Sequence, residues 1–78
     1  MNTQQLILTA LEECYPNLLP HKALLSQVNM SPKCTEPVLP SEFRRELDEL
    51  IPAEVTKIDD RDKGFVYTIT ARGRARIA

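Results

Sequence analysis

The spacing of apolar residues changes at Pro52, and this change constrains the fold more than any other feature of the 78 residues. Before Pro52, apolar residues recur at intervals of three and four positions, which is the pattern of one face of a helix. After it, Phe65, Tyr67 and Ile69 fall on one side of an alternating pattern, which is the spacing of a β-strand. The sequence therefore predicts an α+β domain in which the main helices precede the strands.

Three helices are predicted before Pro52. The first is "NTQQLILTALEECY", with Asn2 as its N-cap and Pro16 as its end. The second lies in "NLLPHKALLSQVN", with Pro20 in its first turn, and the third is "SEFRRELDELI", with Ser41 as its N-cap. The apolar faces of these helices predict a core made of Leu6, Ile7, Ala10, Leu11, Cys14, Leu24, Leu25, Val28, Phe43, Leu47, Leu50 and Ile51.

A β-hairpin and a short final helix are predicted after Pro52. Residues Val55–Ile58 and Phe65–Thr70 are rich in strand-forming side chains, and the "DDRDKG" between them is typical of a tight turn. Thr70 is placed to cap the helix "ARGRARIA". A glycine inside a helix costs about 1 kcal/mol relative to alanine, so Gly73 indicates that this helix packs closely against the hairpin or the first helix.

Two segments resemble the bacterial winged helix-turn-helix family. The closing "YTITARGRARIA" resembles the end of many bacterial winged-helix proteins, and "LPSEFRRELDEL" resembles their recognition helix. The resemblance extends over nearly the whole chain and implies a single winged-helix domain over residues 1–78: a three-helix bundle, a two-stranded β-hairpin wing and a short C-terminal helix. It also implies a small stand-alone DNA-binding protein of the kind found among bacterial and prophage regulators.

The resemblance leaves the partner open, because winged helices serve both as DNA readers and as protein–protein interaction modules. Double-stranded DNA is the partner that we expect, and dimerisation would supply a second half-site. The alternative is an interaction module that binds another protein, through the acidic face of the third helix or through the proline-rich segment.

Five residues are the candidates for contact with DNA. A recognition helix lays the N-terminal part of its outward face in the major groove, which selects Ser41, Arg44 and Arg45. The hairpin turn adds Arg61 and Lys63. The third helix has two arginines and four acids, however, and the turn has three acids against two cations. The alternative interpretation is that Arg44 and Arg45 pair with acids three or four positions away on a solvated face.

The charge of the chain is unevenly distributed. Its net charge is −1, whereas nucleic-acid-binding domains usually carry a basic surplus. Four basic and eight acidic residues precede Lys57, and six basic and three acidic residues follow from there to Ala78. Three of these cations are Arg72, Arg74 and Arg76, which lack nearby acids and fan around the last helix, so we expect them to be solvated and this helix to be structural.

The sequence contains no pattern typical of an enzyme. His21 is the only histidine, has no catalytic motif around it and is predicted to lie at the surface. Cys14 and Cys34 are interpreted as a core residue and a loop thiol, without the spacing of a metal site. We therefore expect no catalysis, no cofactor, no metal and no small-molecule substrate.

The segment "MSPKCTEPVLP", from Met30 to Pro40, is longer than a usual helix–helix connection, and its prolines exclude a regular helix. We expect a rigid, mostly extended loop that offers a contact surface. The N-terminal "MNTQQLILTALEE" lacks the basic region of a signal peptide, and no apolar run approaches the ~20 residues of a membrane span. These features predict a cytoplasmic protein with reduced cysteines and no membrane contact.

Overall fold

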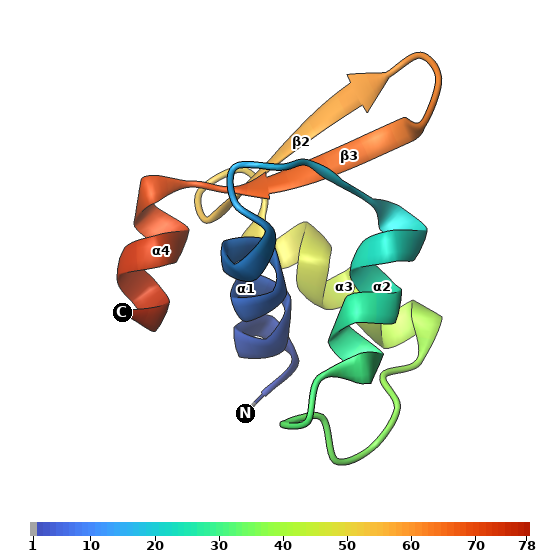
Figure 1. The fold of residues 1–78 in the computed structure, drawn as a ribbon, viewed down its shortest axis with the longest axis vertical. Helices are drawn as coiled ribbons and strands as arrows, with labels where there is room; N and C mark the ends of the chain where they lie inside the picture. The colour runs from blue at the N-terminus through green and yellow to red at the C-terminus, as the bar shows by residue number, and fades with distance from the viewer. Residues whose placement is uncertain (1) are drawn as a thin grey trace.

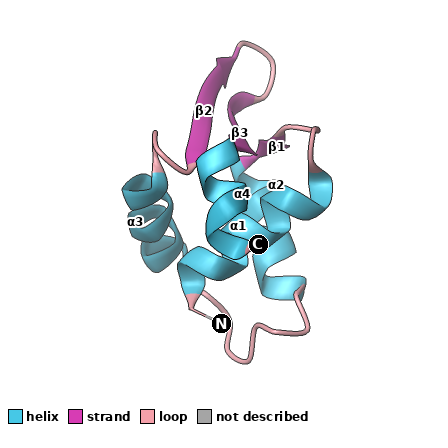
Figure 2. Cartoon of the chain, turned by 90° about the vertical axis from the view of Figure 1, so that its left-hand side faces the viewer, coloured by secondary structure: helices cyan, strands magenta, loops and turns pink. Residues whose placement is uncertain are grey.

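The computed structural model describes residues 2–78 and confirms the α+β class. Within these residues, four helices (Figure 1) accompany one three-stranded antiparallel sheet, whose short strand β1 is labelled in Figure 2. In chain order the elements are α1 (Thr3–Cys14), β1 (Leu19–Pro20), α2 (His21–Met30), α3 (Pro40–Leu50), β2 (Val55–Asp60), β3 (Gly64–Ile69) and α4 (Ala71–Ile77). In this range, no helix combines the length and the apolar character that crossing a membrane requires.

Helix α1 is the centre of the molecule. It packs against α2, α3, α4 and β3, and α4 lies on the side of α1 away from α2 (Figure 1). The β2–β3 hairpin projects beyond the helices, as the view in Figure 2 also shows. The core between these elements contains Leu6, Ile7, Leu8, Ala10, Leu11, Leu24, Val28, Val38, Phe43, Leu47, Leu50, Val55, Tyr67 and Ile69.

Of the two cysteines, Cys34 lies in the loop as predicted, whereas Cys14 is not in the predicted core position. Cys14 is only half-buried and lies outside the core cluster, whereas Cys34 packs against that cluster from the loop. Both are free thiols. The assignment of Cys14 to the core was wrong because it is the last residue of α1, where the helix face has no further turn to cover it.

The sheet has one strand more than the predicted hairpin. Its order is β1-β3-β2, with Leu19 opposite Tyr67 and Pro20 opposite Val66. Sequence patterns do not reveal β1 because it has two residues and ends in a proline, which cannot donate to a strand ladder. This short strand fixes the start of α2 against the hairpin, since His21 follows it directly.

The helix starts are partly as predicted. Asn2 caps α1 through a capping box, in which its side chain accepts from the amide of Gln5 and the Gln5 side chain accepts from the amide of Asn2. The prediction that Ser41 caps α3 was wrong. Leu39 is the N-cap, without a side-chain hydrogen bond, and Pro40 takes the first helical position, for which its fixed φ is suited.

Helix α4 is held close to the hairpin. The Thr70 side chain caps it by accepting from the Gly73 amide at 3.1 Å and donates to the Ala53 carbonyl at 2.7 Å. A Cβ atom at Gly73 would overlap the carbonyl oxygen of Glu54 and lie 2.8 Å from Cγ1 of Ile69. The predicted packing reason for this glycine is confirmed.

The loop between α2 and α3, residues 31–39, is anchored to the core. Val38 is buried, and the side chain of Asn29 accepts from its amide at 2.7 Å and donates to its carbonyl at 3.5 Å. The Cys34 thiol donates to the Glu36 carbonyl at 3.0 Å. These contacts hold the loop without regular secondary structure, as the prolines predict.

Candidate nucleic-acid interface

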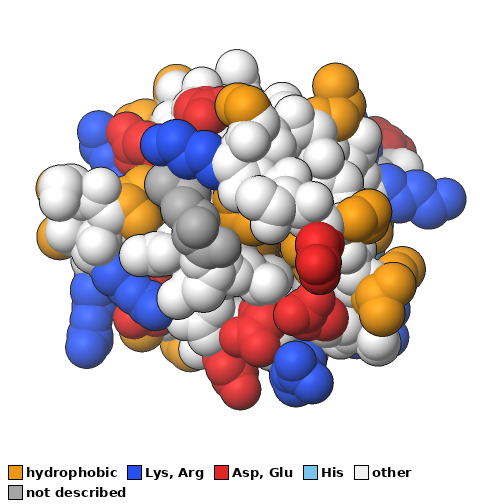
Figure 3. All heavy atoms as spheres, turned by 90° about the horizontal axis from the view of Figure 1, so that it is seen from below, with side chains coloured by type: hydrophobic (Ala, Val, Ile, Leu, Met, Phe, Trp, Pro, Cys, Tyr) orange, Lys and Arg blue, Asp and Glu red, His pale blue; other side chains and the backbone are white. Residues whose placement is uncertain are grey.

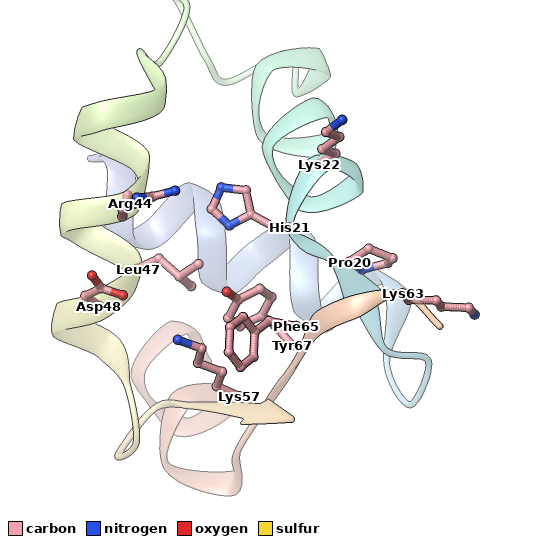
Figure 4. Close-up of a pocket in the computed structure, with 10 residues that line it drawn as sticks. All are labelled: Pro20, His21, Lys22, Arg44, Leu47, Asp48, Lys57, Lys63, Phe65 and Tyr67. Atoms are coloured by element: carbon pink, nitrogen blue, oxygen red, sulfur yellow. The ribbon is translucent and has the colours of Figure 1, made fainter. Parts of the chain in front are cut away.

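A groove of about 700 Å³ lies between the start of α2, helix α3 and the β2–β3 hairpin (Figure 4). Its lining includes four cations and only one carboxylate. Three aromatic or heteroaromatic rings complete it together with two apolar side chains. The lining residues are Lys22, Arg44, Lys57 and Lys63, then Asp48, then His21, Phe65 and Tyr67, and finally Pro20 and Leu47.

The charges of α3 are separated to two sides of the helix. Gln4 of α1 donates to Glu46 and to Glu49, at 3.0 Å each, and the Thr3 hydroxyl donates to Glu42 at 3.5 Å. Three of the four acids of α3 therefore face α1, and acidic side chains gather in one group on the lower half of the surface in Figure 3. The fourth acid, Asp48, lies one turn after Arg44 and lines the groove with it.

The structure brings four of the five predicted contact residues to this side of the molecule. Arg44 lines the groove and, with Ser41 and Arg45, a shallower hollow of about 580 Å³ beside it. Lys63 lines the groove from the hairpin, whereas Arg61 lies exposed in the turn and lines neither hollow.

The alternative interpretation placed Arg44 and Arg45 in ion pairs with acidic residues three or four positions away in the sequence. Among residues 2–78, Arg44 forms no ion pair, and Arg45 instead contacts the adjacent Glu46 at 3.4 Å. The Arg45 side chain is 67% exposed in this contact. Exposed ion pairs contribute only about 0–1 kcal/mol, so this pair does not hold Arg45 away from a ligand.

His21 is not the surface residue that the sequence predicts. It is half-buried at the floor of the groove, where its ring meets that of Phe43 edge-on at a centroid distance of 5.0 Å and lies 6.2 Å from that of Tyr67. Burial lowers the pKa of His21, and the cations Arg44 and Lys57 lower it further, against the opposite effect of Asp48. Burial and Asp48 also raise the pKa of Tyr67.

The hairpin presents an aromatic ring and a cation together. Lys57 pairs with Tyr67 across the strands, and its ammonium lies 4.0 Å from the ring centroid of Phe65. Asp60, the last residue of β2, is occupied at the turn, where its side chain accepts from the amides of Asp62 and Lys63 at 2.8 and 3.1 Å. One of the three turn acids is therefore engaged with backbone donors.

Several groove residues escaped the sequence predictions, namely Lys22, Lys57, Phe65 and Tyr67, together with His21. Strand alternation places Lys57, Phe65 and Tyr67 on one hairpin face. This alternation is the only sequence pattern that could have indicated that the three residues belong to one site. Which helix that face meets depends on tertiary packing.

The arginines of α4 face away from the groove. Arg74 donates to Glu12 of α1 at 2.8 Å and lies 4.4 Å from the ring centroid of Tyr15. Arg76 donates to Gln4 at 2.7 Å. Both residues are exposed, as expected, but the sequence did not reveal their partners, which come from α1 at the other end of the sequence. The structural role that we expected for α4 agrees with these contacts.

Comparison with protein-family models, with curated proteins and with solved structures gives no match. Within residues 2–78, no three His, Cys, Asp or Glu side chains are grouped to hold a metal ion. The groove, its charges and its rings are therefore the basis for a functional interpretation.

Proposed function

We propose that this chain is a winged helix-turn-helix protein that binds double-stranded DNA, with α3 as recognition helix and the β2–β3 hairpin as wing. The observation that carries the proposal is the separation of charge on α3. Arg44 lines a groove with three lysines and a single carboxylate, whereas Glu42, Glu46 and Glu49 face α1.

This separation removes the main objection to α3 as a reading helix. Acids near phosphates repel DNA, and α3 as a whole carries more acids than cations. With three acids turned toward α1, the N-terminal half of α3 can present Ser41, Arg44 and Arg45 to base edges and phosphates in the major groove. Asp48 would accept from a cytosine amino group or remain beside Arg44.

The wing and the start of α2 would contribute phosphate contacts. Lys57 and Lys63 extend from the hairpin, and Lys22 extends from the first turn of α2. The positive end of the α2 dipole adds to the potential on the same side. Arg61, exposed in the hairpin turn, is placed to follow the DNA backbone beyond the groove.

The proposal is tested by fluorescence anisotropy with a labelled blunt duplex of mixed sequence, across a series of salt concentrations. If the four cations of the groove each neutralise one phosphate, the logarithm of the association constant falls against the logarithm of salt with a slope of about −3.6. No binding at low salt would refute the proposal and favour the protein-interaction alternative.

A matched pair of variants locates the interface. Arg44→Ala removes one cation from the groove and should reduce the magnitude of the slope by about 0.9. Arg72→Ala removes the same charge from the exposed surface of α4 and should leave both slope and affinity near the parent values. Equal effects of the two substitutions would show that the groove is not where DNA binds.

A further inference from the structure

Phe65 is an exposed aromatic ring inside a cationic groove. It is 47% exposed, although it belongs to a strand whose next residues, Val66 and Tyr67, are buried. In the view of Figure 4, its ring lies between the side chains of Lys57 and Lys63. Packing does not require an aromatic ring at this position, because nearly half of its surface contacts solvent.

We propose that this groove takes one unpaired nucleotide base, stacked on Phe65, so that the protein prefers duplex DNA with a single-stranded extension to blunt duplex DNA. The inference rests on the proposed DNA-binding function and names the form of DNA that the groove recognises.

The composition of the groove supports this choice of ligand. Sites for single-stranded nucleic acid combine cations that follow the backbone with aromatic side chains on which bases stack. The volume of about 700 Å³ lies within the usual range for sites that enclose small molecules, roughly 300–1,000 Å³. Inside a duplex, the neighbouring pairs cover both faces of each base, and a blunt end opens only the outer face of its terminal pair. An unpaired base instead offers a free ring face that can enter the groove and stack on Phe65.

Lys57 occupies the ring face of Phe65 in the free protein, and a stacking base would have to displace it. Its ammonium now covers the Phe65 ring at 4.0 Å, and its side chain is exposed and free to move to a phosphate. An exposed cation–π contact changes an equilibrium by about 2- to 5-fold. Stacking of a base on an aromatic ring changes it by roughly 5- to 150-fold, so the base displaces the ammonium from the ring.

One carboxylate lies near the ring outside the groove. Asp59 is opposite Phe65 in the hairpin register but does not line the groove. The phosphates of an unpaired strand are therefore expected at Lys57 and Lys63, which line the groove, although Asp59 lies between Lys57 and the turn on the same hairpin face.

The test compares three labelled DNAs that share one duplex: blunt, extended by four nucleotides, and extended by four abasic nucleotides. The abasic extension carries the same phosphates without bases. The parent protein should bind the normal extension about 5- to 10-fold more tightly than the abasic one. Extensions at the 3′ end and at the 5′ end of a strand are tested separately. Phe65→Leu should abolish this difference, so that the variant binds the normal and the abasic extension equally.

Ile58→Ala is the matched control, because Ile58 is 40% exposed on the opposite face of the same hairpin, and it should preserve the preference. Equal affinity of the parent protein for normal and abasic extensions would overturn the inference and leave duplex binding intact. A preference that survives Phe65→Leu would also overturn it. Binding to extended but not to blunt DNA would support the inference and refute the duplex proposal.

Discussion

Gly73 gives the sharpest test of how the last helix is held. The substitution Gly73→Ala adds one methyl group that would overlap the carbonyl oxygen of Glu54 and lie 2.8 Å from Cγ1 of Ile69. The Glu54 carbonyl cannot easily move, because it accepts from the Thr70 amide at 3.0 Å. The added atom must therefore push α4 away from the hairpin and weaken that hydrogen bond.

Two opposing effects determine the size of the change. Alanine is favoured over glycine inside a helix by about 1 kcal/mol. Inserting a methyl group into a packed site costs typically about 1–3 kcal/mol, and the rigid backbone partner at Gly73 places the cost in the upper part of that range. We expect a net loss of about 1–2 kcal/mol in the free energy of unfolding, which corresponds to a fall in Tm of roughly 4–16 °C for a domain of this size.

The measurement is urea and thermal unfolding followed by circular dichroism at a helix-sensitive wavelength. Gly64→Asn is the matched control, because a Cβ atom at Gly64 would have no neighbour within 4 Å, and its φ of 77° is one that asparagine tolerates better than most residues. It should change the free energy of unfolding by less than about 1 kcal/mol. A Gly73→Ala protein as stable as the parent would refute the close contact between α4 and Glu54.

Two further predictions concern the groove and the loop. Because burial lowers the pKa of His21 in the folded state, the unfolded chain takes up the proton first, and the free energy of unfolding falls as pH decreases through 6.5. In His21→Gln this fall should be smaller when urea unfolding is compared at about pH 7.5 and 5.5. Asn29→Ala leaves the buried Val38 amide without its partner and should cost about 1–3 kcal/mol in urea unfolding, whereas Asn17→Ala, at an exposed turn, should change little. An Asn29→Ala protein with unchanged stability would contradict the anchoring of the loop.

Most of the secondary structure is predictable from local patterns. The capping box at Asn2, the cap at Thr70 and the hairpin turn depend on residues a few positions apart, which sequence alone reveals. The exceptions have physical causes. Strand β1 is too short to form a pattern, and α3 begins at Pro40 with Leu39 as its N-cap, so that Ser41 already lies inside the helix.

The candidate site was predictable only in part. Residue type and position in the N-terminal half of α3 identify Ser41, Arg44 and Arg45 as candidates, and Lys63 follows from the turn. His21 was misplaced because its burial depends on Phe43 and Tyr67, which come from two other elements. Helical spacing alone does not reveal that a neighbouring helix binds one side of α3.

The sequence by itself determined the helices, the hairpin and the need for a glycine at position 73, because these depend on periodicity, caps and backbone preference within short segments. Only the tertiary structure decided where the charges of α3 point. Gln4 and Thr3 engage its acids from α1, across 39 to 45 positions of sequence, and this leaves Arg44 facing the lysines and rings of the hairpin. The physical reason is that packing of the buried face of α3 against distant elements, rather than the net charge of the helix, decides which side of it is available to a ligand.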